Sequence, residues 1–448
     1  MPSAPLPLLV AERHPLVDAL LARAPGTLGG CDRAIHPHDE MLGHALAVRH
    51  GDLDAALVDY FREGLQVALA VRQVAQWRWG GLPEVKSLLD FASGCGRVTR
   101  FLVREIPAER VVVSDIQTDA IAFQTTRLGV RTLPSAARAE DFGAENGFDL
   151  IWVTSLFSHL PEPDFHAWLG RLVECLAPAG LLALSVHDPS VLRPQEAFPA
   201  SGFLFRRHSE SRVLDPEAYG STFVSESYLR AAVERTTAGA WCHRLPRAIG
   251  NFQDLYLIAL ESPALPAPLL DFGPMGHLDC CQQTAAGFLE IVGWAAHWSG
   301  DAVASVSVRL DGEIVATIHE FSPRPDVVAA HRGLRAASGF AANCAVPADL
   351  SRSQAILAVE GLSAAGASSL LFLGTVAAAE TASLRAELAT AREQRCQREG
   401  WFQHVEQELQ RMVAERESRL EAMRRSRFWR AREAWFRLKR AWRLTDKG

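Results

Sequence analysis

Short apolar runs alternate with helical periodicity through the first 260 residues of the chain. Apolar residues recur at helical spacing over Leu53–Trp79 and predict a long amphipathic helix. Seven later runs have the length of buried strands: Ser87–Phe91, Arg110–Ser114, Val130–Leu133, Phe148–Val153, Leu181–Val186, Ala240–Leu245 and Leu255–Leu260. Helical patterns separate most of these runs, including one over Ser225–Arg235. This alternation predicts an α/β fold with a Rossmann-like doubly wound sheet.

The pattern changes after the Pro-rich segment 262–268, which we interpret as a domain boundary. Beyond it, apolar and polar residues alternate with period two, as in Val306, Val308 and Leu310, and helical patterns are absent. Asp311-Gly312 is typical of a tight hairpin turn. We therefore expect a small all-β sandwich over residues 269–375.

Residues 377–444 contain no proline and are dense in Glu and Arg, which predicts a long C-terminal helix. Apolar residues at 3-4 spacing make it a candidate coiled coil, through which the chain could form a homo-oligomer. Together these patterns predict four segments. They are a Pro-rich, loosely packed N-terminal lead-in (1–49), an α/β domain (50–262), the sandwich (269–375) and the helix (377–444).

The net charge of −6 combines two regions of opposite sign. Residues 421–448 hold ten Lys or Arg against three acids, and the remaining chain holds 36 bases against 49 acids. The acidic body argues against a nucleic-acid partner. In the tail, Phe428, Trp435 and Trp442 share one helical stripe, so residues 421–444 are predicted to bind a membrane surface or a partner helix. An oligomerisation seam is the alternative.

Eight scattered cysteines without a C-x-x-C pair indicate reduced thiols and no zinc site. The first thirteen residues lack the pattern of a secretory signal. We therefore expect a cytoplasmic protein, with the basic tail able to hold it at the inner face of the membrane. His36-Pro37-His38-Asp39-Glu40 has no known metal-ligand spacing, so we interpret it as a solvated loop and predict no metal.

The strongest chemical signal is the turn that follows the first strand, Asp90-Phe91-Ala92-Ser93-Gly94-Cys95-Gly96. Glycines there let a ligand approach the backbone, and Asp115 ends the next strand, where a carboxylate can hold ribose hydroxyls. A dinucleotide site would favour a small residue at Thr99. Asp90 suits a cationic ligand better than a pyrophosphate, so the sequence favours S-adenosylmethionine.

Residues 50–262 resemble the class I S-adenosylmethionine-dependent methyltransferases. The resemblance rests on Leu89–Gly96, on the second and fourth strands (Val112–Ile116, Phe148–Val153) and on Leu176-Ala177-Pro178-Ala179-Gly180. Ala92 and Ala179 stand where the family usually has glycine. The resemblance implies the following cofactor-binding residues: Asp90, Ala92, Gly94, Gly96, Asp115, Ile116, Ala139, Glu140, Ser155 and Leu156. Tyr60 resembles a tyrosine that covers the cofactor in similar proteins, and ordinary helix packing is the alternative.

Methyl transfer to a hydroxyl group gains from a general base. The candidates at the carboxyl ends of strands are His187, Asp188 and His159, and we expect His187-Asp188 to act as a pair. The sandwich resembles Ig-like modules of bacterial surface-glycan enzymes, through Gly293-Trp294-Ala295 and Gly339-Phe340. The tail resembles endings of surface-polysaccharide proteins.

We therefore predict O-methylation of a glycan or lipid-linked saccharide. A non-catalytic scaffold with this fold, or a methyltransferase for small molecules or proteins, are the alternatives.

Overall fold

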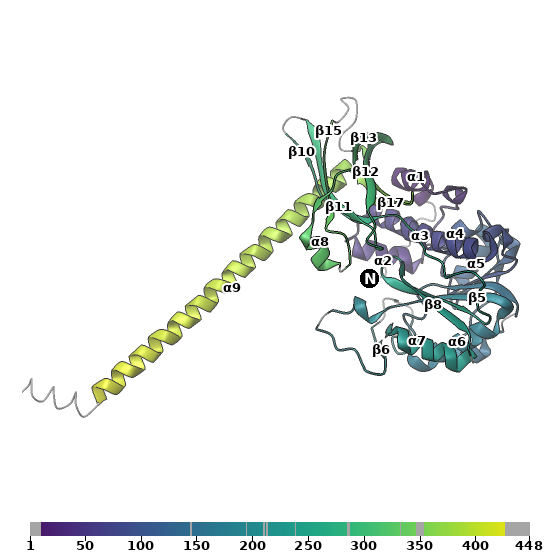
Figure 1. Cartoon of the computed structure of the whole chain (residues 1–448), viewed down its shortest axis with the longest axis horizontal. Helices are drawn as coiled ribbons and strands as arrows, with labels where there is room; N and C mark the ends of the chain where they lie inside the picture. The colour runs from purple at the N-terminus through teal and green to yellow at the C-terminus, as the bar shows by residue number, and fades with distance from the viewer. Residues whose placement is uncertain are drawn as a thin grey trace, which may run out of the picture. The chain divides into compact units, whose positions relative to one another are not determined.

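The computed structural model describes residues 10–143, 146–193, 195–208, 211, 214–237, 239–284, 287–331, 333–345 and 354–425 (Figure 1). In the α/β part the helices are α1 (Pro15–Leu21), α2 (Glu40–Val48), α3 (Leu53–Trp79), α4 (Thr99–Leu102), α5 (Thr118–Leu128), α6 (Glu162–Glu174) and α7 (Glu226–Thr237). Its main strands are β1 (Leu88–Phe91), β2 (Val111–Ser114), β3 (Arg131–Thr132), β4 (Phe148–Val153), β5 (Leu176–Val186), β8 (Trp241–Ile249) and β9 (Gln253–Ala259). A short pair, β6 (Phe203–Arg206) and β7 (Ser221–Val224), lies between β5 and α7 in sequence.

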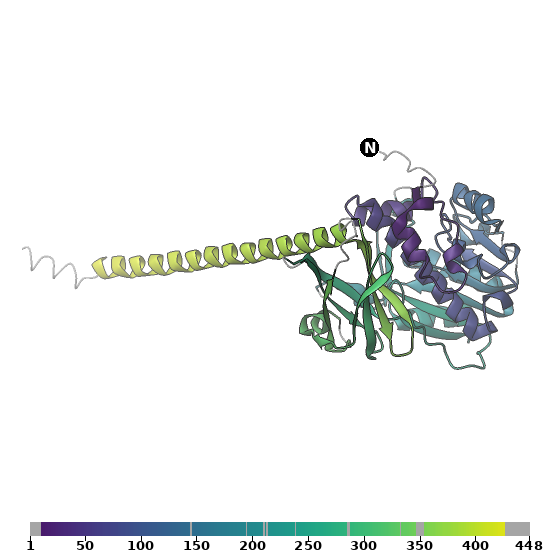
Figure 2. The same ribbon diagram turned by 90° about the horizontal axis from the view of Figure 1, so that it is seen from above.

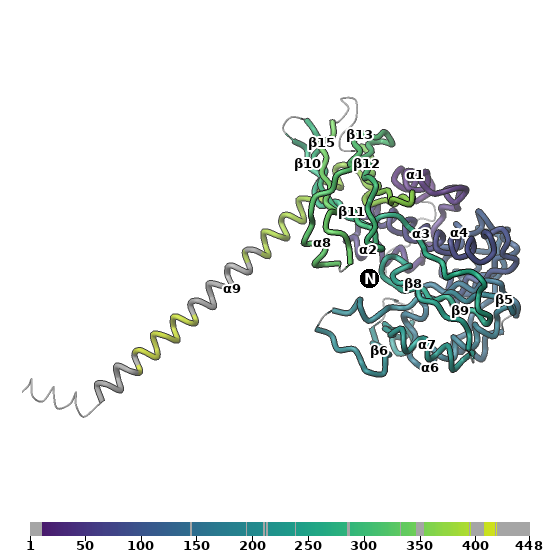
Figure 3. The backbone as a smooth tube through the Cα atoms, in the orientation of Figure 1, coloured from purple at the N-terminus to yellow at the C-terminus, as the bar shows by residue number. Residues whose placement is uncertain are grey.

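These strands form one seven-stranded sheet in the order β3-β2-β1-β4-β5-β9-β8. The first five are parallel, whereas β9 runs antiparallel to β5 and β8 runs antiparallel to β9. Figure 3 shows β8 and β9 beside β5 at one side of the sheet. The predicted doubly wound sheet is confirmed. The sequence did not indicate that β9 runs antiparallel to both of its neighbours.

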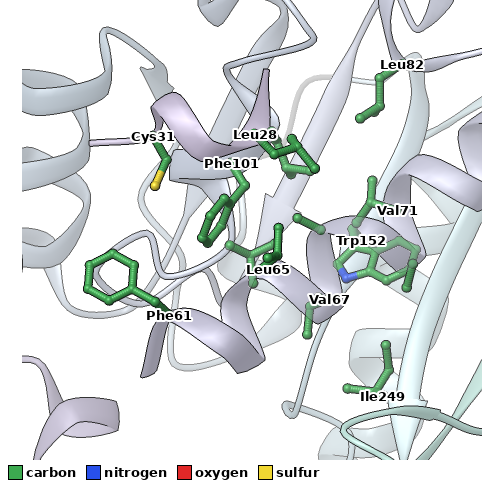
Figure 4. Close-up of a cluster of buried hydrophobic side chains, with 14 of the residues drawn as sticks. Leu28, Cys31, Phe61, Leu65, Val67, Val71, Leu82, Phe101, Trp152 and Ile249 are labelled. Carbon is green, nitrogen blue, oxygen red and sulfur yellow. The ribbon is translucent and has the colours of Figure 1, made fainter. Parts of the chain in front are cut away.

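Helix α3 has the bounds that its periodicity predicts, Leu53–Trp79. Asp52 caps its first turn by accepting a hydrogen bond from the Ala55 amide (3.1 Å), and Gly80 ends it in the left-handed conformation (φ +87°). One side of the helix buries Phe61, Leu65 and Val71 in a core that also contains side chains of β1 and β4 (Figure 4). α3 is therefore the central helix of this face.

Alternating side chains of each strand separate the interior into two cores. On β4, Leu150 and Trp152 join the core that contains α3, whereas Ile151 and Val153 join the core that contains α6 and α7. Trp152 lies among Val67, Val71 and Ile249 in Figure 4. Both faces of the sheet are covered, which is the arrangement that near-continuous apolar strands require.

The N-terminal lead-in differs from the prediction. Residues 10–48 form two α-helices and two short 3₁₀ segments rather than a loose segment. Leu16, Val17 and Leu20 of α1 are buried in the same core as α3. The apolar face of this segment lies on a helix of only seven residues, which is too short to give a clear periodicity in a Pro-rich sequence.

After the Pro-rich segment 262–268 the chain builds two four-stranded sheets, β10-β11-β15-β14 and β13-β12-β16-β17. Their strands are β10 (Met275–Gln283), β11 (Phe288–Ala296), β12 (Val303–Leu310), β13 (Glu313–Ile318), β14 (Ser322–Pro323), β15 (Ala337–Ala345), β16 (Ile356–Ser363) and β17 (Ser368–Thr375). Helix α8 (Pro325–Ala330) precedes β15. We call this part the β module.

The two sheets of the β module share a core that includes Ile291 and Phe340 from one sheet and Val306, Val308 and Leu357 from the other. The antiparallel pairing agrees with an all-β module. The Ig-like relationship remains a prediction. Asp311 and Gly312 both have positive φ (45° and 91°), as the hairpin signal requires.

The β module packs directly on the α/β part. Gln73 of α3 forms two hydrogen bonds with the backbone of Asp271, one to its carbonyl (3.0 Å) and one from its amide (2.9 Å). Ala358 and Leu373 of the β module belong to the apolar core that contains α3. The two parts therefore share one continuous core.

The remaining described chain is helix α9 (Val376–Arg425), shown in Figures 1 and 2, most of which forms a separate compact unit. Coiled-coil pairing through this helix remains a prediction. The basic stripe with Phe428, Trp435 and Trp442 lies outside the described residues. Among the helices that the structure describes, none combines the length and apolarity that a membrane crossing needs.

Because Leu373 fills part of the core around α3, Leu373→Ala should destabilise the α/β part as well as the β module. We expect a loss of about 2–5 kcal/mol in the free energy of unfolding. Urea unfolding followed separately by tryptophan fluorescence and far-UV circular dichroism measures it. Two separate transitions, with only one shifted by the substitution, would contradict the shared core.

Candidate functional site

Most of the predicted cofactor residues lie on the loops that follow β1, β2 and β4, at the carboxyl edge of the sheet. Asp90 lies within β1, Ala139 and Glu140 lie after β3, and Tyr60 lies in α3. After β1 the backbone turns sharply, and Ala92, Gly94 and Gly96 all have positive φ (58°, 55° and 78°). Glycine adopts such angles freely, whereas alanine does so at a cost of about 1–2 kcal/mol. Ala92 therefore occupies a position whose geometry favours glycine.

Asp115 holds this loop in place from the end of β2. One carboxylate oxygen accepts a hydrogen bond from the Gly94 amide (2.8 Å), and the other accepts one from the Gln117 amide (2.9 Å). Burial raises the pKa of Asp115, and the backbone amides of Gln117 and Gly94 oppose that shift. The side chain thus joins the two loops that the sequence assigned to the cofactor.

Gln124 of α5 holds the same loop through two hydrogen bonds. Its amide nitrogen donates to the Ser93 hydroxyl and to the Gly94 carbonyl, both at 2.8 Å. A methyl group added to Gly96 would lie 2.8 Å from the Gln124 side chain, so Gly96 is required for this packing. By contrast, a methyl group added to Gly94 would meet no atom within 4 Å, because Gly94 faces open space.

Negative charge converges on this loop. Asp90 is 4% exposed, accepts a hydrogen bond from the Thr99 hydroxyl (2.6 Å), and has its pKa raised to about 7 mainly by burial. Burial raises the pKa of the Cys95 thiol, and the carboxylates of Asp39, Asp115 and Asp119 raise it further. The surroundings of the loop therefore favour a positively charged ligand.

A buried arginine connects the loop to the N-terminal segment. Arg100, 1% exposed, donates to the Gly96 carbonyl (2.9 Å), to the Ala34 carbonyl (2.8 Å) and to the Tyr60 hydroxyl (3.1 Å). Tyr60 is itself 1% exposed and donates to Asp39 (2.7 Å). This geometry corresponds to the packing alternative for Tyr60, which influences the loop through Arg100.

The other predicted cofactor residues differ in exposure. Ile116 is 46% exposed although it is apolar, as expected for a side chain that covers a flat ligand. Ala139 is buried, and Glu140 pairs with Arg138 on the surface. Leu156 packs against the core that contains α6.

A polar network lies beyond the ends of β4 and β5, centred on Gln253 at the start of β9. Its side-chain oxygen accepts from the Ser185 hydroxyl (2.6 Å), and its nitrogen donates to the Ser155 hydroxyl (2.9 Å) and lies 3.2 Å from His187 Nε2. Ser155 has a positive φ of 61°. This hydrogen-bond arrangement makes Nε2 of His187 an acceptor and places its proton on Nδ1.

His187 is buried and neutral. It is 7% exposed, and burial together with His159 lowers its pKa to about 4. Among the described residues, its Nδ1 has no hydrogen-bond partner. His159, whose ring centre lies 6.0 Å from that of His187, places Nδ1 2.7 Å from the Gly220 carbonyl and stacks on Tyr219. The structure therefore brings the two predicted histidines together.

Asp188 does not contact His187 through any hydrogen bond of its side chain that the structure describes. It accepts hydrogen bonds from Arg244 (2.8 Å) and from the Ser190 amide (2.9 Å). Arg244 also binds Asp254 and Glu226. Asp188 thus belongs to an ion-pair cluster beside the histidines, and the partner of His187 is Gln253.

The segment His36–Glu40 is more structured than a solvated loop. Asp39 caps α2 through the Met41 amide (2.9 Å), and ligand atoms of His36, His38 and Asp119 lie within 4.8 Å of one another. However, Nδ1 of His36 accepts a hydrogen bond from the His38 amide (3.3 Å), which places the ring proton on Nε2. His36 then offers no free lone pair, and we assign no ion to these three residues.

Comparison with known proteins agrees with this geometry. Residues 88–180 match a family of proteins described as "Methyltransferase domain". Over this segment the chain is therefore similar to methyltransferase domains. No curated protein matches the chain.

Solved structures with similarity include the DhpI–SAH complex (20% identity, 50% of this chain and 95% of that chain, TM-score 0.32). They also include the 1,6-didemethyltoxoflavin-N1-methyltransferase of Burkholderia thailandensis (16%, 49% and 86%, TM-score 0.33). The mitomycin 7-O-methyltransferase MmcR is a third (16%, 49% and 60%, TM-score 0.32). These similarities are too weak to carry an argument about the substrate of this chain.

Sequence patterns did not reveal three residues of the site: Arg100, Gln124 and Gln253. Arg100 and Gln124 lie in helices that flank the glycine loop, where a polar residue among apolar ones was the available signal. Gln253 lies on a strand whose antiparallel position was not predicted. Its place in the site follows from the topology alone.

Ala92→Gly should stabilise the α/β part because it removes the strain of a positive φ. Removal of the strain contributes about 1–2 kcal/mol, and the greater conformational freedom of glycine in the unfolded chain offsets part of it. We expect the free energy of unfolding to rise by up to about 1 kcal/mol. Chemical denaturation measures the gain, with Ala177→Gly, on β5, as the control that should destabilise. Destabilisation by Ala92→Gly would show that the loop has another conformation in solution.

Proposed function

We propose that this protein transfers a methyl group from S-adenosylmethionine to an acceptor bound beside His159 and His187. The main support is the convergence of Asp115, the glycine loop and the acidic surroundings of Cys95 at the carboxyl edge of a methyltransferase domain. This cofactor combines a sulfonium and an ammonium group with a ribose, and it lacks phosphate. The residues present match that chemistry.

We propose a distinct part of the cofactor site for each group of residues. Gly94 leaves room for the ligand at the backbone, and Asp115 keeps lone pairs for ribose hydroxyls in addition to its two amide contacts. Ile116 offers an exposed apolar side chain to a base, and Asp90 supplies negative charge close to a cationic group. Ala139, Glu140, Ser155 and Leu156 complete the predicted site.

When bound, the cofactor supplies an electrophilic methyl group for in-line displacement. The protein mainly aligns the two reactants, an effect worth about 7–11 kcal/mol in favourable cases. His187 is neutral at physiological pH, because burial keeps its pKa near 4. We propose that the His159–His187 pair orients the acceptor, and that the acceptor hydroxyl replaces the Gln253 amide at Nε2 of His187, which then takes up its proton. Asp188 holds Arg244 beside the pair.

For the acceptor we propose a hydroxyl group of a glycan or lipid-linked saccharide. The support is the resemblance of the β module and the tail to surface-glycan proteins. On the same basis we propose a cytoplasmic enzyme whose basic tail binds the inner face of the membrane or a partner helix. Mass spectrometry of the surface glycan from a deletion strain tests this acceptor: we expect one methyl group to be lost.

A non-catalytic scaffold is the alternative from a different class. Isothermal calorimetry with S-adenosylmethionine separates the two hypotheses. We expect one site per chain in the wild type, and at least about tenfold weaker binding for Asp115→Ala, which loses charge-assisted hydrogen bonds. Asp164→Asn, on α6, serves as the control with unchanged affinity. Absence of binding by the folded wild-type protein would favour the scaffold.

Cofactor affinity should depend on pH through Asp90. Its pKa of about 7 means that the carboxylate is largely protonated below pH 7, so a cationic ligand must displace a proton there. We expect affinity to fall by up to about tenfold per pH unit below 7 and to level off above it. Asp90→Asn should bind more weakly and lose this dependence. A wild-type profile that is flat between pH 5.5 and 8 would contradict the assignment.

His187→Ala should reduce methyl transfer by about 10²–10⁴-fold if His187 takes up the acceptor proton. Affinity for the cofactor should stay unchanged, because His187 lies outside the glycine loop. Transfer of radiolabelled methyl groups to glycan from the deletion strain measures the effect. The exposed His208 supplies the control variant, His208→Ala. Full activity of His187→Ala would remove His187 from the mechanism.

A further inference from the structure

The β8–β9 hairpin carries two residues that contact His187. Gln253 contacts Nε2 of His187, and the neighbouring Phe252 places its ring centre 4.9 Å from that of His187. Phe252 is 50% exposed. The hairpin therefore separates a buried histidine from solvent with one exposed phenyl ring.

The hairpin adopts an unusual backbone. Arg247 and Asn251 have positive φ (51° and 57°), and the pairing of β8 with β9 shifts register between Leu245 and Ile249. A non-glycine residue in this region costs about 1–2 kcal/mol, so contacts from elsewhere must hold it there. One such contact comes from Asp254, which accepts a hydrogen bond from the Arg247 amide (2.8 Å).

The other contacts come from the β module. Trp298 Nε1 donates a hydrogen bond to Asn251 Oδ1 (2.9 Å), and the Arg247 guanidinium lies 4.8 Å from the centre of the Trp298 ring. A single side chain of the β module thus engages both residues with positive φ. Both interactions are of kinds that stabilise a fixed geometry.

Further hydrogen bonds hold the segment that carries Trp298. The preceding residue, His297, bonds through Nε2 to Asp271 (2.9 Å), and Asp271 bonds through its backbone to Gln73 of α3. A continuous series of contacts therefore runs from α3 through the β module to the hairpin. Since α3 also packs on the sheet, these contacts connect the hairpin to the sheet whose strand β5 precedes His187.

We propose that Trp298 of the β module is a positioning residue of the acceptor site. Trp298 acts through Asn251 and Arg247, which place Phe252 and Gln253 against His187. The proposal rests on the proposed function for the role of His187. The coupling between Trp298 and His187 is measurable without any acceptor.

The test uses diethyl pyrocarbonate, which modifies accessible neutral imidazoles, on the full-length protein. Peptide mass spectrometry gives the modification rate of His187, with the exposed His208 as the internal reference. We expect Trp298→Ala to raise the His187 rate by at least about fivefold, the factor that loss of one hydrogen bond produces. Amide hydrogen exchange of residues 249–253 should accelerate by a similar factor.

Two further variants keep the test valid if Trp298→Ala fails to fold. Asn251→Gly removes the same hydrogen bond without changing the β module, and glycine tolerates the positive φ at that position. It should raise both rates as well. Leu357→Val is the matched control, because Leu357 lies in the core between the two sheets of the β module, a core that does not include Trp298. It should leave both rates unchanged.

Unchanged rates at His187 and at residues 249–253 in a folded Trp298→Ala or Asn251→Gly protein would overturn the proposal. Equal acceleration by Leu357→Val would also overturn it, since general destabilisation of the β module would then explain the effect. Cofactor affinity is measured in parallel. Failure of the wild type to bind S-adenosylmethionine would reject the proposed function, whereas the response of His187 to Trp298 would still be tested.

Discussion

The site depends on the carboxylate of Asp115, which joins the ends of β1 and β2. A backbone turn with three positive φ angles has little intrinsic stability, and one of them belongs to Ala92. Asp115 and Gln124 hold this turn through hydrogen bonds to its backbone and to the Gln117 amide. They keep the conformation in which Gly94 faces open space. Without these contacts the loop would lose the shape that leaves space beside Gly94.

Burial determines the electrostatics around this loop. Asp90 and Asp115 lie in surroundings that disfavour their charges, and the pKa of each is raised. A cationic ligand would compensate this cost. Arg100 is different, because its charge is already satisfied by backbone carbonyls and by the Tyr60 hydroxyl. The buried carboxylates instead accept hydrogen bonds from uncharged groups, the Thr99 hydroxyl for Asp90 and backbone amides for Asp115, and neither has a cationic hydrogen-bond partner among the described residues.

The sequence predicted the parts of this molecule that depend on local periodicity. Helix α3, strand β4 and the glycine loop follow from spacing along a short segment, and the structure reproduces them. Gln253 could not be predicted, because its position beside His187 requires β9 to run antiparallel to β5. The expected pairing of His187 with Asp188 is wrong for a similar reason. Consecutive residues at the end of a strand point in different directions, which adjacency in the sequence does not reveal.

Interactions across large sequence distances also escaped prediction. The apolar face of α1 and the contacts of Trp298 depend on surfaces that meet only in the folded chain. Trp298 lies 47 positions from Asn251, its hydrogen-bond partner. Single-sequence patterns carry no information about such pairings.

The shared core around α3 has a consequence for biosynthesis. The last strand of the large sheet, β9, ends at Ala259, yet Leu373 still has to join the same core. A ribosome must therefore synthesise more than about 110 further residues before that face of the α/β part is fully covered. During this interval the nascent chain exposes apolar surface, and the order of synthesis makes the β module the step that completes folding.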